Sequence, residues 1–133
     1  MKQDSKRTRK TSEPRPGDRS PCPIATALDI IGDKWTLIVL RDLFMGKRPY
    51  GAFLESPENI PTNILANRLK RLVAEGLAEK IPYQERPLRY DYKLTDKGMR
   101  LLPVLQELCR WTNRYYPESW KPPARFMKVR IRN

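Results

Sequence analysis

The chain of 133 residues carries 27 Lys and Arg against 15 Asp and Glu and contains no His, which gives a formal net charge of +12. This length suits one domain with tails. The absence of His, of a glycine-rich phosphate loop and of clustered metal ligands argues against an enzyme, a metal site or a cofactor. No apolar run approaches the roughly 20 residues of a membrane span, so we expect no membrane association.

The basic charge is concentrated at the two ends of the chain. Residues 1–20 hold seven Lys and Arg against three Asp and Glu, and residues 121–133 hold five Lys and Arg and no acid. Basic tails favour a polyanion such as nucleic acid as partner, and a solubilising tail is the alternative. Residues 1–20 have almost no apolar side chains, so we expect a disordered tail there and not a secretory signal.

The folded domain is expected to span residues 21–116 and to begin with two helices. A first helix over residues 23–31 has Pro in its first turn and ends at Gly32. Asp33 is placed to cap a second helix over residues 34–45, which is apolar on nearly all sides and therefore central. A small third helix is expected at residues 50–55, followed by the turn residues SPEN.

The most informative stretch is PTNILANRLKRLVAEG, at residues 61–76. Its apolar residues recur at helical spacing, which predicts one buried stripe. The opposite face carries side chains that can reach base edges and phosphates from a major groove, namely Thr62, Asn63, Asn67, Lys70 and Arg71. A short helix, a turn and a longer helix with such a face indicate a helix-turn-helix. The alternative is an ordinary amphipathic helix whose polar side is solvated.

Two short strands are predicted after this helix, at residues 77–83 and 89–93, with a basic loop between them. Residues 89–93 alternate strictly between polar and apolar side chains, as a half-buried strand does. A hairpin directly after a recognition-type helix indicates a wing. Arg86 and Arg89 would then contact phosphates or enter the minor groove, whereas the alternative is solvated loop charge.

The last predicted helix starts after Thr95, which can cap it, and Pro103 should bend it. Its apolar residues form a seam that could pack on its own domain, but we expect a homodimer because symmetric dimers are the commonest oligomers. The expected dimer residues lie on this helix and the first one: Ile24, Leu28, Leu105, Leu108, Trp111 and Tyr115. The Pro-containing basic extension, residues 117–133, is not expected to be helical and would dock on the partner or follow DNA.

Several segments together resemble the HxlR-type bacterial and archaeal transcriptional regulators over about residues 21–115. They are CP at 22–23, GDKWT at 32–36, RL at 68–69, EGL at 75–77, YDYKLTDKG at 90–98, and Leu108 with Trp111. Two segments depart from the family pattern, PYGAF at 49–53 and Pro61-Thr62 at the start of the long helix.

The resemblance implies a mainly α fold with a small β-hairpin wing, a winged helix-turn-helix paired as a homodimer through its N- and C-terminal helices. It also implies that Thr62, Asn63, Ala66, Asn67 and Lys70 face the major groove. Some members of the family sense oxidants or electrophiles through a cysteine at the position of Cys22.

The two cysteines, Cys22 and Cys109, make no disulfide framework, which favours a reducing cytoplasm. A thiol at a helix N-terminus beside a basic segment is favoured for reactivity, so Cys22 is a candidate redox site. A small buried apolar residue is the alternative for Cys22, and packing on the seam is expected for Cys109.

We therefore predict a sequence-specific transcriptional regulator that binds double-stranded DNA as a homodimer. Phosphate contacts would supply most of the affinity and make it salt-dependent. Asn63, Asn67 and Lys70 would discriminate between bases. The alternative is a winged-helix module that binds RNA or another protein. The operator, the sign of regulation and any effector do not follow from the sequence.

Overall fold

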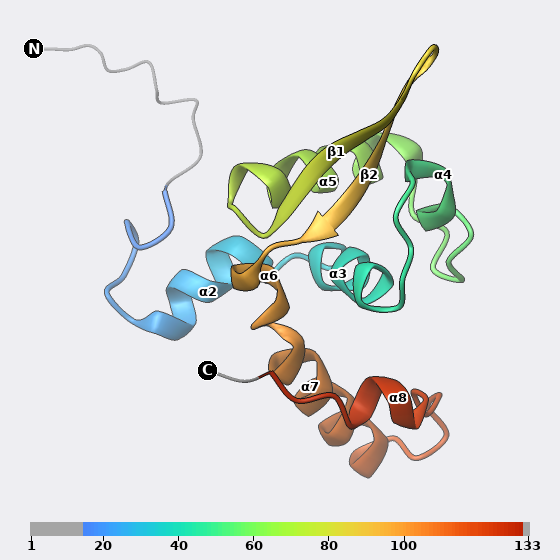
Figure 1. Cartoon of the computed structure of the whole chain (residues 1–133). Helices are drawn as coiled ribbons and strands as arrows, with labels where there is room; N and C mark the ends of the chain where they lie inside the picture. The colour runs from blue at the N-terminus through green and yellow to red at the C-terminus, as the bar shows by residue number, and fades with distance from the viewer. Residues whose placement is uncertain (1–14, 132–133) are drawn as a thin grey trace, which may run out of the picture. The chain divides into compact units, whose positions relative to one another are not determined.

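The structure is a computed structural model that describes residues 15–131. Its backbone separates into the units Met1–Asp33 and Lys34–Asn133. In the described residues, the first unit holds α2 (Pro23–Ile31). The second holds α3 (Thr36–Phe44), α4 (Tyr50–Phe53), α5 (Thr62–Ala74), β1 (Ala78–Glu85), β2 (Leu88–Leu94), α6 (Asp96–Met99), α7 (Leu102–Tyr115) and α8 (Ala124–Met127) (Figure 1). The mainly helical architecture with one hairpin is the predicted fold class.

Within its described residues, 15–33, the first unit contains α2 and the turn that leads into it. The helix begins at Pro23 and ends before Gly32, as predicted. Part of the tail that was expected to be disordered is tied to this helix, because the Arg19 guanidinium donates to Asp29 Oδ1 at 2.6 Å. Residues 1–14 of the predicted tail lie outside the described residues.

The core of the second unit forms where α5 packs on α3. The predicted apolar stripe of α5 is buried, with Leu65, Leu69 and Leu72 each at most 1% exposed. Val39 and Leu40 of α3 are buried to the same degree. Burial of each such side chain contributes about 1.5–3 kcal/mol relative to exposure. The stripe therefore fixes which way α5 is turned about its axis.

An ion-pair network joins α3 to the turn that precedes α5. The guanidinium of Arg41 donates to both oxygens of Glu58, at 2.6 and 2.9 Å, and to Asp42 Oδ1 at 2.9 and 3.0 Å. Buried Asp42 also accepts a hydrogen bond from the hydroxyl of buried Ser56. Lys47 Nζ donates to the same hydroxyl at 2.9 Å. The network therefore holds the turn between α4 and α5 at two residues, Ser56 and Glu58.

The hairpin of β1 and β2 projects from the helical body (Figure 1). The strands are antiparallel and longer than predicted, so that only Arg86 and Pro87 separate them. Their register shifts between Pro82, opposite Tyr90, and Gln84, opposite Arg89, which leaves Tyr83 as an extra residue. Such a bulge re-aims side chains and increases the local twist.

Two predicted helix boundaries are wrong. The second helix, α3, starts later than predicted, at Thr36, and its N-cap residue is Trp35 and not Asp33. Thr95 does cap a helix, accepting from the Gly98 N–H at 3.1 Å, but that helix, α6, stops at Met99. Pro103 then lies in the first turn of α7 instead of bending a long helix. A first-turn Pro lacks only an N–H that would be unpaired anyway.

The C-terminal extension contains the short helix α8, contrary to the expectation drawn from its prolines. Pro123 stands just before the helix, where its fixed φ suits a helix start. The buried amide of Gln106 on α7 donates to the carbonyls of Phe126, at 3.0 Å, and Val129, at 2.8 Å. Phe126 packs edge-on against Phe44 of α3, with ring centroids 6.4 Å apart. The extension thus belongs to the core of its unit.

The Arg41–Glu58 pair predicts a pH-dependent stability. The hydrogen bonds from Arg41 hold the pKa of the Glu58 carboxyl below its ordinary value near 4.5, although partial burial acts in the opposite direction. The ionised form is thus favoured in the folded chain, so its stabilisation is present at neutral pH and is lost as the pH falls below about 4.5. Glu58→Gln should lower the free energy of unfolding at pH 7 by about 0.5–1 kcal/mol, as for other accessible pairs.

Urea unfolding at pH 7, 5.5 and 4, at one protein concentration, measures this difference. The gap between the wild type and Glu58→Gln should shrink toward pH 4. Glu55→Gln is the control, because Glu55 is exposed in the same turn. Its free energy of unfolding should stay within about 0.5 kcal/mol of the wild-type value. A gap that is the same at every pH would contradict the ion-pair assignment.

Candidate nucleic-acid interface

The outward face of α5 presents the side chains predicted to meet DNA. Because the leucine stripe faces α3, the opposite side of the helix is left to solvent. Five of the six predicted residues are exposed there: Thr62, Asn63, Ala66, Asn67 and Lys70. Arg71 is half-buried at the edge of this face. The structure therefore brings the predicted recognition residues together on one accessible surface.

The N-terminal end of α5 is suited to a phosphate. Pro61 is its N-cap and makes no side-chain cap bond, and the first turn holds no acidic residue. The N-terminal end of an α-helix carries partial positive charge and free N–H groups, both of which favour bound anions. Tyr50 of α4 donates its hydroxyl to the carbonyl of Thr62 at 2.9 Å and so ties α4 to the helix start. Nothing in the sequence signalled this contact.

Asn67 is already engaged by a neighbour. Arg68 Nη1 donates to Asn67 Oδ1 at 2.6 Å. An Asn that reads adenine uses its amide as donor and acceptor together. Such a contact requires the Arg68 side chain to move aside or to turn to a phosphate. Sequence reasoning assigned Arg68 no role at this surface, although it bonds one of the predicted recognition residues.

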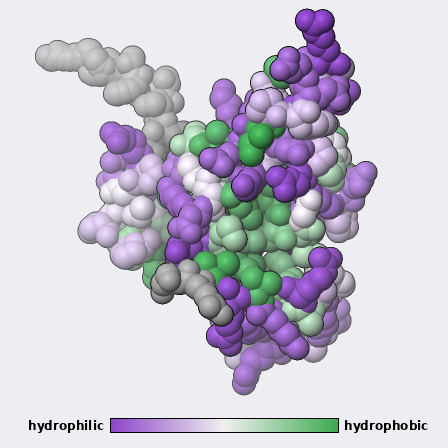
Figure 2. All heavy atoms as spheres, in the orientation of Figure 1, coloured by the Kyte–Doolittle hydropathy of each residue, from purple (hydrophilic) through white to green (hydrophobic). Residues whose placement is uncertain are grey.

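The wing adds a second basic surface. Arg86 at the tip and Arg89 on β2 are both exposed, which fits a DNA contact and solvated loop charge alike (Figure 2 shows hydrophilic side chains over the projecting hairpin). Below them, a groove of about 400 Å³ separates the wing from α4. It is lined in part by Tyr50, Lys80, Tyr83, Arg89 and Tyr90.

Lys80 and Tyr83 in this groove were missed by sequence reasoning. The Lys80 ammonium lies 4.2 Å from the centroid of the Tyr90 ring, in cation–π geometry. Strict alternation along β1 would place Lys80 and Tyr83 on opposite faces, whereas the bulge at Tyr83 lets both line the groove. A bulge of this kind has no clear sequence signal beyond the nearby Pro82.

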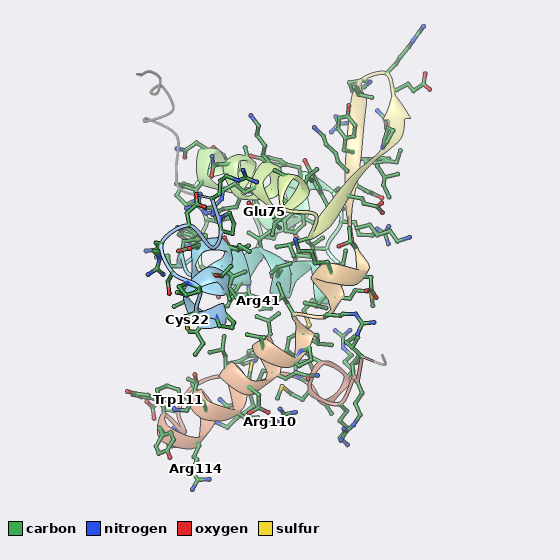
Figure 3. All side chains as sticks on the ribbon, turned by 90° about the vertical axis from the view of Figure 1, so that its left-hand side faces the viewer. Cys22, Arg41, Glu75, Arg110, Trp111 and Arg114 are labelled. Carbon is green, nitrogen blue, oxygen red and sulfur yellow. The ribbon has the colours of Figure 1, made fainter. Side chains whose placement is uncertain are left out.

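The residues expected at a dimer interface have different surroundings. Ile24 and Leu28 on α2 are 71% and 52% exposed, and Leu108, Trp111 and Tyr115 on α7 are exposed as well. Figure 3 shows Trp111 extending outward from α7. Leu105 is instead buried, only 7% exposed, so its assignment to the dimer surface is wrong. It lies on the side of α7 that faces its own core.

The two cysteines also differ. Cys22 is exposed at the N-cap of α2, which does not fit the alternative of a small buried residue. Cys109 on α7 is half-buried, and this burial raises the pKa of its thiol. Within residues 15–131, no cluster of three or more His, Cys, Asp or Glu is placed to hold a metal ion. The helices described for this chain are also too short or too polar to cross a membrane.

Comparison with known proteins gives one consistent family. The model of the HxlR-like helix-turn-helix family matches residues 30–120. An uncharacterised HTH-type transcriptional regulator of Mycobacterium tuberculosis is 35% identical over 102 residues, which cover 77% of this chain and 64% of that protein. The chain thus spans slightly less than two thirds of this relative. YvaP, an uncharacterised HTH-type transcriptional regulator of Bacillus subtilis, is 31% identical over 74% of this chain and 93% of its own length.

Solved structures show the same fold. The redox regulator HypR in its oxidised form matches with a TM-score of 0.64 and 29% identity, over 70% of this chain and 96% of HypR. The reduced form of the transcriptional regulator YodB from Bacillus subtilis matches with a TM-score of 0.61 and 29% identity, over 74% of this chain and 98% of YodB.

Proposed function

Because the chain belongs to the HxlR-like helix-turn-helix family of transcriptional regulators, we propose that it binds double-stranded DNA sequence-specifically as a homodimer. The observation that carries this proposal is the exposed face of α5, with Asn63, Asn67 and Lys70 side by side on a helix whose other side is buried. Asn and Lys are suited to base edges in a major groove. The exposed Arg86 and Arg89 of the wing would contact the backbone on the flank.

The first test is selection of bound fragments from random duplex DNA, followed by affinity measurements on the selected duplex. Asn67→Ala should weaken binding to that duplex by about 1–3 kcal/mol and should hardly change binding to random duplex, because it removes a base contact. Arg86→Ala should weaken binding to both duplexes alike. It should also reduce the slope of the logarithm of the binding constant against the logarithm of the salt concentration by about one.

Arg114→Ala is the charge-matched control, because Arg114 is exposed on α7, away from α5 and the wing (Figure 3). Arg114 lies over the Tyr115 ring of the proposed dimer cluster, so light scattering must first show that the variant keeps the wild-type mass. It should change neither duplex affinity by more than twofold. Equal losses on both duplexes for Asn67→Ala and Arg86→Ala would contradict the proposed division between base reading and backbone contact. Preference for structured RNA over every duplex would support the alternative of an RNA-binding module.

The homodimer is proposed from the exposed aromatic cluster on α7. Trp111 packs its ring on those of Tyr115 and Tyr116, with centroids 5.7 and 6.0 Å apart, and is itself 58% exposed. Aromatic side chains exposed in a cluster are typical of the buried centre of an interface. Two copies joined there would present two copies of α5 to two half-sites.

Trp111→Asp should therefore convert the protein to a monomer, since a buried, unpaired carboxylate opposes association. Light scattering coupled to size-exclusion chromatography measures the mass. Leu88→Asp, which alters an exposed leucine on the wing, is the control and should remain a dimer. A monomeric wild type, or a Trp111→Asp variant that remains dimeric, would contradict this assignment.

Cys22 is proposed as the thiol through which oxidants or electrophiles act. Its exposure supports this role, and solved structures of similar fold include a protein described as a redox regulator. At pH 7.5 a maleimide should label Cys22 much faster than Cys109, because Cys109 is half-buried and its raised pKa keeps the thiol protonated. Mass spectrometry of timed samples measures both rates, with Cys22→Ser as control. Faster labelling of Cys109 would contradict the assignment.

A further inference from the structure

A cavity of about 610 Å³ lies among α3, α7, the turn before α5 and the C-terminal extension. Leu37 and Ile38 of α3, Leu108 of α7, and Trp120 and Phe126 of the extension supply much of its apolar lining. Figure 2 shows hydrophobic surface on this face, bordered above and below by hydrophilic side chains. Cavities of about 300–1,000 Å³ with mostly apolar linings are typical of small-molecule sites.

The wall formed by the extension is held in place within one chain. At one end, Gln106 of α7 hydrogen-bonds the carbonyls of Phe126 and Val129. At the other end, Asn113 Nδ2 donates to the Ser119 hydroxyl at 2.7 Å and to the Trp120 carbonyl at 3.1 Å. Two amides from the same helix therefore fasten the extension on either side of the cavity. A preformed wall lowers the entropy that a ligand must offset when it binds.

The polar end of the cavity is electrically balanced. It is formed by two cations, Arg41 and Lys47, and two carboxylates, Asp42 and Glu58. Arg41 bonds both carboxylates, and Ser56 links Lys47 to Asp42. An ionic ligand would have to disrupt these pairs, so the lining favours a neutral one. Burial also keeps the Cys109 thiol, another lining group, in its neutral form by raising its pKa.

We propose that this cavity binds a neutral, largely apolar aromatic molecule and thereby regulates DNA binding. The cavity is in direct contact with the segment that leads into α5. Ser56, Pro57 and Glu58 line the cavity and belong to the turn that leads into α5. A ligand there contacts the segment that positions the recognition helix. The regulatory part rests on the proposed function as a DNA-binding regulator, whereas the binding site itself does not.

A second copy of the chain is the competing occupant. Leu108 belongs both to the cavity lining and to the exposed apolar face of α7 proposed as the dimer surface. The intrachain fastening of the extension and the balanced polar end favour the small molecule. The experiment must nevertheless report the oligomeric state together with ligand binding.

The test uses N-phenyl-1-naphthylamine, a neutral aromatic probe whose fluorescence rises in apolar surroundings, and the full chain. We expect saturable binding of one probe per chain. Thr112→Trp fills the cavity from α7 and should weaken probe binding at least tenfold. Cys109→Phe, a second filling variant, should act in the same direction. Arg114→Trp places the same indole side chain on α7 but outside this lining, and it should bind the probe like the wild type.

Equal probe affinity in Thr112→Trp and the wild type, or an equal loss in Arg114→Trp, would overturn the site. So would a Thr112→Trp variant that becomes monomeric by light scattering, because the cavity would then be part of the subunit interface. A Thr112→Trp variant that keeps the wild-type mass but binds the probe at least tenfold more weakly supports the site.

The regulatory part is measured on the selected duplex. Saturating probe should change the duplex affinity of the wild type at least fivefold, the lower end of typical couplings, and should not change that of Thr112→Trp. No change in the wild type would overturn the regulation while leaving the site intact. A protein that binds no duplex even without probe would instead overturn the proposed function, and the probe titration would still decide the cavity.

Discussion

Burial of the leucine stripe of α5 against α3 is the constraint on which the rest of the molecule depends. Leu65, Leu69 and Leu72 recur at three and four residues and are almost fully removed from solvent. Rotation of the helix by one residue would expose these side chains, at about 1.5–3 kcal/mol for each, and would bury Asn or Lys without partners. The identity of the outward face is therefore set by the core, and the candidate DNA-contacting residues follow from it.

The Arg41 network complements this constraint. The leucine stripe fixes the rotation of α5, whereas the bonds from Arg41 to Glu58 and from Ser56 to Asp42 fix the turn from which the helix starts. The network also forms the polar end of the apolar cavity. One set of side chains thus links the core, the presentation of the recognition helix and the proposed ligand site.

The features that the sequence predicted are those with a local periodic signal. The stripe of α5, its polar face and the alternation in β2 are visible because each repeats at the spacing of its own element. The features that were missed depend on contacts between distant segments. Pro103 is compatible with a bend or with a helix start, and only the three-dimensional path selects the second.

Leu105 is a second residue whose position depends on contacts between distant segments. Its spacing assigns it to a seam, but the docking of the C-terminal extension and α3 decides which part of that seam is buried within the chain. The hydrogen bond from Tyr50 to α5 and the bulge at Tyr83 are likewise products of packing, so the groove below the wing had no periodic signature.

The central claim is that the outward face of α5 lies in a major groove. Ala66→Cys, which alters an exposed residue of the same face without removing a proposed base contact, can be introduced into a chain carrying Cys22→Ser and Cys109→Ala, coupled to an iron-EDTA cleavage reagent and bound to the selected duplex. We expect strand cleavage at two clusters whose centres lie about 10–11 base pairs apart. Cleavage no stronger than that from the same reagent on a Glu107→Cys chain would contradict the claim.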